Sequence, residues 1–301
     1  DLRELGDVDL GTFLRETGFE LEDVYDGRGS WSDLRRWAGF ERQSPSDQDT
    51  VVERAFGRML HLDDFDRLDR LTALDLRDDL QADSQDAYQR LLFVLLGQTD
   101  SFEHMQPTWD RLRRSDWLRR ELRELLTALA DRCRRVTHAG QDGALREHAT
   151  YSRFEIFAAF DVRTDKGGGV KKTQTGVYYL DQVRTDLFFV TLHKSEKGFT
   201  STTMYRDYPL SPALFHWESQ STCHTGTPTG LRYLSVGHGE QRGLLFVRER
   251  QDDDRGSAMP YVNLGPVRYR SHDSARPMRI EWELERAMPA EFYQQAKLAA
   301  G

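Results

Sequence analysis

The densest group of residues suited to chemistry lies between His193 and Tyr233, in HKSEKGFTSTTMYRDYPLSPALFHWESQSTCHTGTPTGLRY. This stretch combines the three kinds of group that reading a nucleic acid requires. Hydroxyl and ammonium groups can bind phosphates, aromatic rings can stack on bases, and carboxylates or amides can bond base edges. The residue types therefore predict a surface or pocket that recognises DNA.

The run YRDYPLSPALFHWESQ is the predicted base-reading part. A ring can stack on an unstacked base, and a carboxylate can accept a hydrogen bond from the cytosine amino group. The candidates are Tyr205, Asp207, Tyr208, Phe215, Trp217, Glu218, Ser219 and Gln220. Phe215 and Trp217 alternate with His216 and Glu218, so one of these two sets faces the core, and core packing remains the alternative for the aromatic rings. Tyr205 and Tyr208 are expected near a loop at the rim.

Phosphate contacts are predicted from mobile or loop-borne polar side chains that act without regard to base sequence. The candidates are Lys171, Lys172, Lys194, Ser195, Lys197 and Thr202. The first two lie in DKGGGVKKTQTG, which is rich in glycine and lysine. That loop lacks the Gly-x-x-x-x-Gly-Lys-Ser/Thr spacing that cradles nucleotide phosphates, so a basic hairpin loop is favoured over a nucleotide site.

Motifs for catalysis or metal binding are missing from the sequence. There is no Gly-x-Ser-x-Gly elbow, and His193 stands directly beside Lys194 instead of in the His-x-Lys spacing of phospholipase-D-type nucleases. Cys133 and Cys223 lie far apart, and no His-x-Glu-x-x-His or Cys-x-x-Cys spacing occurs. We therefore expect no catalytic residue, no metal and no cofactor, and a reducing, cytoplasmic setting.

The charge of the chain differs between its halves, which predicts two domains with different roles. Residues 1–150 hold 22 basic and 32 acidic residues, a net charge of −10, whereas residues 151–301 hold 20 and 18, a net charge of +2. No apolar run is long enough to span a membrane, so no membrane partner is expected. The first residue is not Met, which suggests a piece of a longer protein.

The first half is expected to be helical, because apolar residues recur every three or four positions. The pattern is clearest in VVERAFGRMLHLDD, AYQRLLFVLL and DWLRRELRELLTALADRCRRV. Ser44 to Asp47 can cap a helix start before the first of these runs. Acidic clusters such as LDDFDRLDRL are interpreted as solvated helix faces, with a docking surface for a basic partner as the alternative. We expect a helical domain over residues 1–139 and a linker over 140–150.

The second half, residues 151–301, is expected to be rich in strands. Short runs of Val, Thr, Phe and Tyr are separated by Gly, Pro and Asp turns, in TGVYYL, DLFFVTLH, GLLFVRER, YVNLGPVRYR and MRIEWELE. In the last run the apolar residues and the acids Glu281 and Glu283 alternate, as in a half-buried strand. YSRFEIFAAF, residues 151–160, is expected to form one helix. The fold class is thus α+β, with a mainly antiparallel β-barrel or sandwich after the helical domain.

Several of these runs together resemble the uncharacterised domain at the C-terminus of bacterial superfamily 2 helicase proteins. They are YLDQVRTDLFFVTLHKSEKGFTSTTMYRDYPLSPALFHWESQ, TPTGLRY, LLFVRER, YVNLGPVRY and RPMRIEWELE. That family includes ATP-dependent type IV restriction enzymes, which join a phospholipase-D-type nuclease and a helicase motor to this region. The helical half, with FLRETGFELEDVYDGRGSWSDLRRWAG, resembles more loosely the segment that joins the motor to that domain.

The resemblance implies that the β-rich domain recognises double-stranded DNA containing methylated cytosine, while the helical half couples recognition to upstream helicase and nuclease domains. Since this sequence holds neither nuclease nor helicase motifs, it is expected to bind and not to cut. Clustered aromatics and carboxylates favour a pocket for a flipped base, and by analogy alone an SRA-like or PUA-like barrel would suit it. The alternative is a protein-interaction module that docks on the motor or nuclease and does not bind DNA.

Overall fold

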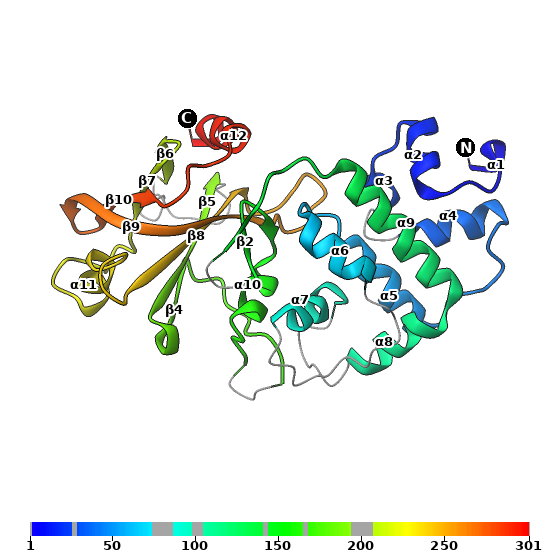
Figure 1. Cartoon of the computed structure of the whole chain (residues 1–301), viewed down its shortest axis with the longest axis horizontal. Helices are drawn as coiled ribbons and strands as arrows, with labels where there is room; N and C mark the ends of the chain where they lie inside the picture. Colours follow the sequence, from blue (N-terminus) through cyan, green and yellow to red (C-terminus); the bar gives the residue numbers. More distant parts are fainter. Residues whose placement is uncertain are drawn as a thin grey trace. The chain divides into compact units, whose positions relative to one another are not determined.

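A computed structural model gives the fold and describes residues 2–25, 29–73, 87–97, 105–140, 144–164, 168–193 and 207–300. The chain divides into two compact units, whose elements are labelled in Figure 1. The helical unit comprises residues 1–136, 142–144 and 150–172, and the β unit comprises residues 137–141, 145–149 and 173–301. Each unit is described below by itself.

The helical unit contains the amphipathic helices that the first half predicts. They are α1 (Leu2–Leu5), α2 (Leu10–Thr17), α3 (Leu21–Val24), α4 (Trp31–Ala38), α5 (Asp47–Gly57), α6 (Phe65–Ala73), α7 (Ala87–Leu95), α8 (Met105–Arg114), α9 (Asp116–Arg132) and α10 (Arg153–Ala159), with the short strand β3 (Thr150–Tyr151) before α10. The predicted start of α5 is confirmed, because Ser46 is its N-cap and forms a capping box with Asp49. The helix expected over residues 151–160 is confirmed as α10.

The longest helix of the described chain, α9, organises the helical unit. It contacts α2, α4, α5, α6 and α8. Leu118, Leu122, Leu125 and Leu129 recur at the helical period and are buried, while the side chains between them are mostly polar. The outward face of α9 is therefore left to charged residues.

The β unit is built from the strands that the second half predicts. Its elements are β1 (His138–Ala139), β2 (Arg146–Glu147), β4 (Val177–Leu180), the 3₁₀ turn η2 (Asp181–Val183), β5 (Thr185–His193), β6 (Tyr208–Ser211), β7 (Leu214–Glu218), α11 (Pro228–Leu234), β8 (Arg242–Arg250), β9 (Tyr261–Ala275), β10 (Met278–Leu284) and α12 (Ala290–Ala300). All five quoted strand segments are confirmed as β4, β5, β8, β9 and β10.

The main sheet of the β unit is mainly antiparallel, in the order β4-β5-β8-β9-β10-β7-β6. Only the β5–β8 pair among these neighbours is parallel. The order ends at two four-residue strands, and β6 contains Pro209, which has no N–H for a further ladder. The sheet is open, so the α+β class is confirmed and the closed barrel is wrong.

One face of this sheet packs against helices. The side chains of Phe188, Trp217, Tyr233 and Trp282 form an aromatic cluster, with ring centroids of Phe188 at 5.1, 5.6 and 4.9 Å from the other three. Helix α12 contacts β5, β6 and β8 and adds Phe292 to the same core (Figure 1). A helix thus covers the face that a second sheet would cover in a sandwich.

The division into units differs from the predicted boundaries at the middle of the chain. The segment expected as a linker, residues 140–150, includes β2, whose Arg146 and Glu147 pair with β1 of the β unit. Helix α10, expected at the start of the β-rich domain, belongs to the helical unit, where it contacts α7. In the parts of the chain that the structure describes, no helix has both the length and the apolarity to cross a bilayer.

Candidate nucleic-acid interface

The second face of the sheet carries a row of polar and aromatic side chains across four strands. Tyr208 of β6 lies opposite His216 of β7, His216 lies opposite Glu281 of β10, and Glu281 lies opposite Ser271 of β9. Directly opposed residues project to the same side of a sheet, so these four side chains form one row. We call it the polar row. All four members are partly exposed to solvent.

The polar row contains a stacked pair of rings beside a hydrogen-bonded carboxylate. The Tyr208 and His216 rings are stacked, with centroids 4.7 Å apart and planes at 29°. The Ser271 hydroxyl donates to Glu281 Oε2 at 2.8 Å, which fixes that carboxylate and leaves its other oxygen available to a ligand. An aromatic surface with an adjoining carboxylate is suited to hold a base by stacking and to accept from its amino group.

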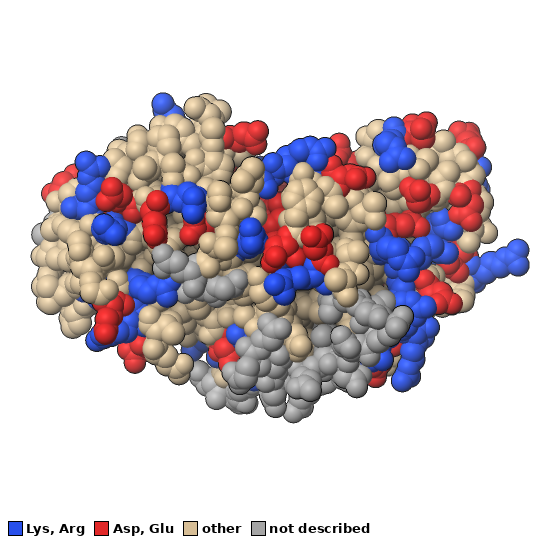
Figure 2. All heavy atoms as spheres, in the orientation of Figure 1, with Lys and Arg blue, Asp and Glu red and all other residues tan. Residues whose placement is uncertain are grey.

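Charged residues flank the polar row. Glu218 of β7 lies opposite Arg279 of β10, two residues along from the row. Arg279 also pairs with Asp273 at 3.5 Å, but both side chains are largely exposed, so this pair is weak and exchangeable. In the view of Figure 2, basic and acidic side chains are interspersed over β9 and β10, without a surface of one sign there.

The backbone beneath the polar row is fixed by buried polar groups. Asp207 is 7 % exposed, and its Oδ1 accepts from the Glu218 N–H at 2.9 Å, which ties the start of β6 to the end of β7. Ser219 is fully buried, and its hydroxyl oxygen accepts from the Met278 N–H at 2.9 Å. These bonds hold the exposed residues of β6, β7 and β10 in register. Asp207 and Ser219 therefore position the polar row through the backbone and are not part of its exposed surface.

The eight predicted base-binding residues thus fall into different places. Tyr208 and Glu218 lie on the exposed face, whereas Phe215 and Trp217 are buried in the aromatic core, as the packing alternative states. The Gln220 side-chain oxygen accepts from the Tyr233 hydroxyl at 3.5 Å, beside that core. Tyr205 lies outside the described residues.

The predicted phosphate-binding residues are only partly described. Lys171 and Lys172 belong to the helical unit, not to the unit that carries the polar row. Lys172 is exposed, and Lys171 is partly exposed with its N–H bonded to the Val162 carbonyl at 3.0 Å. The remaining four, Lys194, Ser195, Lys197 and Thr202, lie outside the described residues.

Sequence reasoning missed His216, Ser271, Glu281 and Arg279 as members of the face. The alternation in FHWE does contain a signal, because burying Phe215 and Trp217 forces His216 to the opposite side. Ser271 and Glu281 are ten residues apart across the β9–β10 turn, and only the strand register brings them together. No periodicity within one strand indicates that pairing.

A separate polar cluster lies at the other end of the sheet. Arg232 of α11 donates two hydrogen bonds of 2.9 Å to Asp186 of β5, and its guanidinium lies 4.0 Å from the centre of the Tyr179 ring. The Gln241 amide also donates to Asp186 at 3.0 Å. With its carboxylate fully occupied, Asp186 fastens α11 to the sheet and is not available to a ligand.

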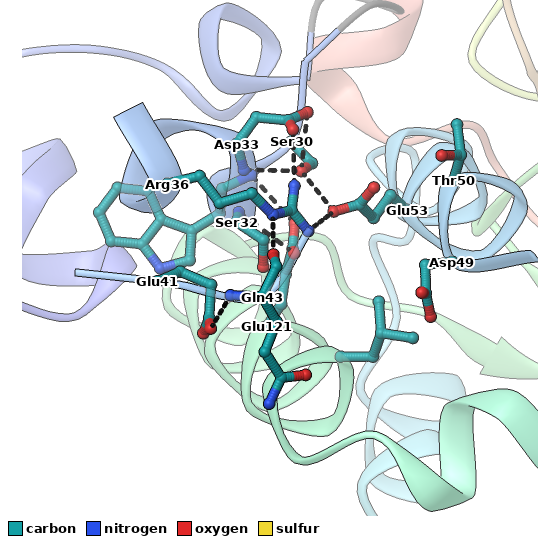
Figure 3. A network of polar contacts seen from close by, with 12 residues as sticks. Ser30, Ser32, Asp33, Arg36, Glu41, Gln43, Asp49, Thr50, Glu53 and Glu121 are labelled. Atoms are coloured by element: carbon teal, nitrogen blue, oxygen red, sulfur yellow. Dashed lines mark hydrogen bonds and ion pairs between the residues drawn. The ribbon is translucent and has the colours of Figure 1, made fainter. Parts of the chain in front are cut away.

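The helical unit holds a polar network around the start of α4 (Figure 3). Arg36 donates to Asp33 and to Glu53 at 2.7 Å each, and Ser30 caps α4 by accepting from the Asp33 N–H. Glu121 of α9 accepts from the N–H groups of Trp31 and Ser32, at 3.0 and 3.2 Å. The network joins α4 to α5 and α9, which is a structural role.

Two buried carboxylates of the helical unit have pKa values shifted in opposite directions. Burial raises the pKa of Glu121 to about 7, and the nearby Glu53 adds to this shift. Burial also opposes ionisation of Glu155, but His61 at 2.5 Å and Arg67 at 2.8 Å outweigh it and lower the Glu155 pKa to about 2. In the described part of the chain, no group of three or more His, Cys, Asp or Glu side chains is arranged to hold a metal.

The sheet that carries the polar row falls within a known family. Residues 145–296, half of the chain, match the family model described as Domain of unknown function (DUF3427). The chain belongs to the DUF3427 family. A comparison with curated proteins finds no match.

The DUF3427 region includes β4 to β10, α11 and most of α12, so it contains the whole polar row. It also includes α10 of the helical unit, which means that the family boundary does not coincide with the division into units. The expected relation to an uncharacterised domain is confirmed. The expected relation to helicases and restriction enzymes remains a prediction.

Proposed function

We propose that the DUF3427 region binds double-stranded DNA and reads modified cytosine on the face that carries the polar row. The observation that supports this most directly is the stacked Tyr208–His216 pair in register with Glu281 on an exposed sheet surface. The rings would stack on the base, and Glu281 or Glu218 would accept from its amino group. Arg279 would contact a neighbouring phosphate.

The added group of a modified cytosine contributes little binding energy by itself, so the protein must enlarge the difference in affinity between modified and unmodified DNA. A buried methyl group contributes about 1 kcal/mol, roughly a fivefold change in affinity. If the base leaves the DNA stack and is held against a ring, its stacking and its edge hydrogen bonds both depend on how well that one base fits the protein surface. We therefore propose that the base is flipped onto the Tyr208–His216 surface, and not into the buried aromatic cluster.

We further propose that this chain is the recognition part of an ATP-dependent type IV restriction enzyme, with the helical unit coupling it to upstream motor and nuclease domains. The support is the resemblance of the strand-rich runs to the C-terminal region of such enzymes and the difference in charge between the halves. Purified alone, the chain is expected to bind DNA and to leave it uncut. Cleavage by the isolated chain would contradict this assignment.

The test of the binding face uses fluorescence anisotropy with duplexes that differ only in one cytosine, unmodified, 5-methylated or 5-hydroxymethylated. Replacing Glu281→Ala removes the acceptor beside the rings and should weaken binding of the preferred duplex by about tenfold, the scale of one base-edge contact. Glu249→Ala, an exposed change on β8 outside the polar row, is the matched control and should bind as the unaltered chain does. Equal binding by both variants would exclude Glu281 as a reader.

A protein-docking function is the second candidate, and one feature of the helical unit favours it. Phe19 and Trp37 are 50 % and 56 % exposed, and both line a hollow of about 490 Å³ together with Leu2, Leu5 and Phe13. Exposed aromatics beside a hollow are typical of interaction sites. If docking on the motor or nuclease is the only function, Trp37→Ser should abolish that association while the chain binds no DNA.

A further inference from the structure

Arginines gather on the outer surface of the helical unit where α8 ends and α9 begins. Figure 2 shows basic side chains concentrated over the N-terminal part of α9 and the end of α8. We call this set the arginine patch: Arg42, Arg113, Arg114, Arg119, Arg120 and Arg123. Every one of them is at least partly exposed.

Contacts and helix geometry show that these arginines are neighbours. Arg119 donates to the Arg113 carbonyl, which joins the first turn of α9 to the last turn of α8. Arg120 donates to Glu41 at 2.8 Å, so it lies beside Arg42, whose own N–H is bonded to the same Glu41. Arg119 and Arg123 are one helical turn apart, about 6 Å along the axis.

The arginine patch carries an excess of positive charge. Three of its members pair with acids, Arg113 with Asp110, Arg119 with Asp116 and Arg120 with Glu41. Among the residues that the structure describes, no carboxylate is paired with Arg42, Arg114 or Arg123. Residues 1–150 have a net charge of −10, from 22 basic and 32 acidic residues. The positive excess of the patch is therefore opposite in sign to the net charge of the half that contains it.

The two other acids nearest the patch on α9 bond inward to the rest of the helical unit and do not cover the patch, and the exposed Asp131 lies at the far C-terminal end of the helix. Glu121 is 1 % exposed and caps α4, while Glu124 accepts from the Leu10 N–H at 2.9 Å and from the Trp31 indole at 2.7 Å. Like charges one turn apart destabilise a helix slightly, so the outward arginines repel one another without a ligand. An anion bound across them would relieve that repulsion.

We propose that the arginine patch binds the phosphate backbone of a nucleic acid. Guanidinium groups bind phosphate oxygens through paired hydrogen bonds and remain charged at all relevant pH values. A protein partner would require an apolar centre in the interface, but Trp117, Leu118 and Leu122 between the arginines are buried in the unit. Backbone binding needs only the charge. The proposal concerns the helical unit alone and is independent of base reading by the polar row.

The test compares two double variants of the full chain on one unmodified and one 5-methylcytosine duplex across a series of salt concentrations. Arg114→Gln with Arg123→Gln removes two patch charges without leaving an acid unpaired. Arg15→Gln with Arg134→Gln removes two exposed arginines, one on α2 and one just after α9, whose side chains bond to the Thr12 hydroxyl and to backbone carbonyls and not to acids, and is the matched control. Thermal unfolding checks that both variants fold as the unaltered chain does.

We expect the patch variant to lose about tenfold in affinity for both duplexes, with a salt slope smaller by about 2, one for each lost phosphate contact. The ratio of affinities for the two duplexes should not change, whereas a failure of base reading would appear in that ratio. Unchanged affinity and slope would overturn the proposal. Binding of polyglutamate is measured as well. If the patch variant bound both duplexes as the unaltered chain does but no longer bound polyglutamate, the proposal would also be overturned, because that would identify an acidic protein as the ligand.

Discussion

At the scale of single residues, burial decides which side chains can contact a ligand. Phe215 and Trp217 have the right chemistry to stack on a base, yet they are in the core, and His216 between them is on the exposed face. The sequence predicts this division but cannot say which set is inward, because both alternations satisfy a two-residue period. The packing of α12 on one face decides it.

Glu121 gives a residue-scale prediction for stability against pH. Its pKa is about 7 in the folded chain against 4.5 as the ordinary value, so the folded state keeps a proton that the unfolded state releases between these values. The resulting stabilisation is complete below pH 4.5 and is lost as the pH rises to about 7, by an amount of about 3 kcal/mol at most. Denaturant unfolding at pH 5, 6, 7 and 8 measures it.

Replacing Glu121→Gln should remove this contribution, so the unfolding free energy of the variant should fall less between pH 5 and pH 7 than that of the unaltered chain. Glu16→Gln, an exposed change on α2, should keep the full pH dependence. Parallel curves for the Glu121 variant and the unaltered chain would show that Glu121 does not titrate in this range.

At the scale of elements, hydrophobic periodicity predicts most helices and strands, but it does not predict how the sheet ends. The five quoted strand segments and the capped start of α5 are confirmed. The closed barrel is wrong, because closure depends on pairing between edge strands and not on any pattern within a strand. Pro209 in β6 is the local signal that this strand is an edge.

Two glycines within helices are expected to respond to alanine in opposite ways. A Cβ at Gly230 in α11 would lie 2.0 Å from the His224 carbonyl oxygen, so Gly230→Ala must displace backbone and should destabilise the chain by about 1–3 kcal/mol. At Gly11 in α2 the nearest atoms lie at 3.4 Å or more, so Gly11→Ala should be neutral or stabilising, by up to about 1 kcal/mol. Equilibrium unfolding compares the two, and equal effects would contradict the close contact.

At the scale of the whole molecule, the uneven charge predicts two parts with different roles, and the structure does divide into two compact units. Composition did not locate the arginine patch, because an excess of three arginines is hidden in a half with a net charge of −10. Nor did it locate the polar row, because Tyr208, His216, Glu281 and Ser271 come from four strands. Both surfaces arise from register and packing over long sequence distances.

The central claim is that the exposed Tyr208–His216 surface reads modified cytosine in DNA. The most direct measurement is the ratio of dissociation constants of the unaltered chain and of Tyr208→Ala for duplexes that differ only in one 5-methyl group. The account predicts that the unaltered chain prefers the methylated duplex by about fivefold or more, and that Tyr208→Ala binds both duplexes equally. Equal binding of both duplexes by the unaltered chain would contradict the account.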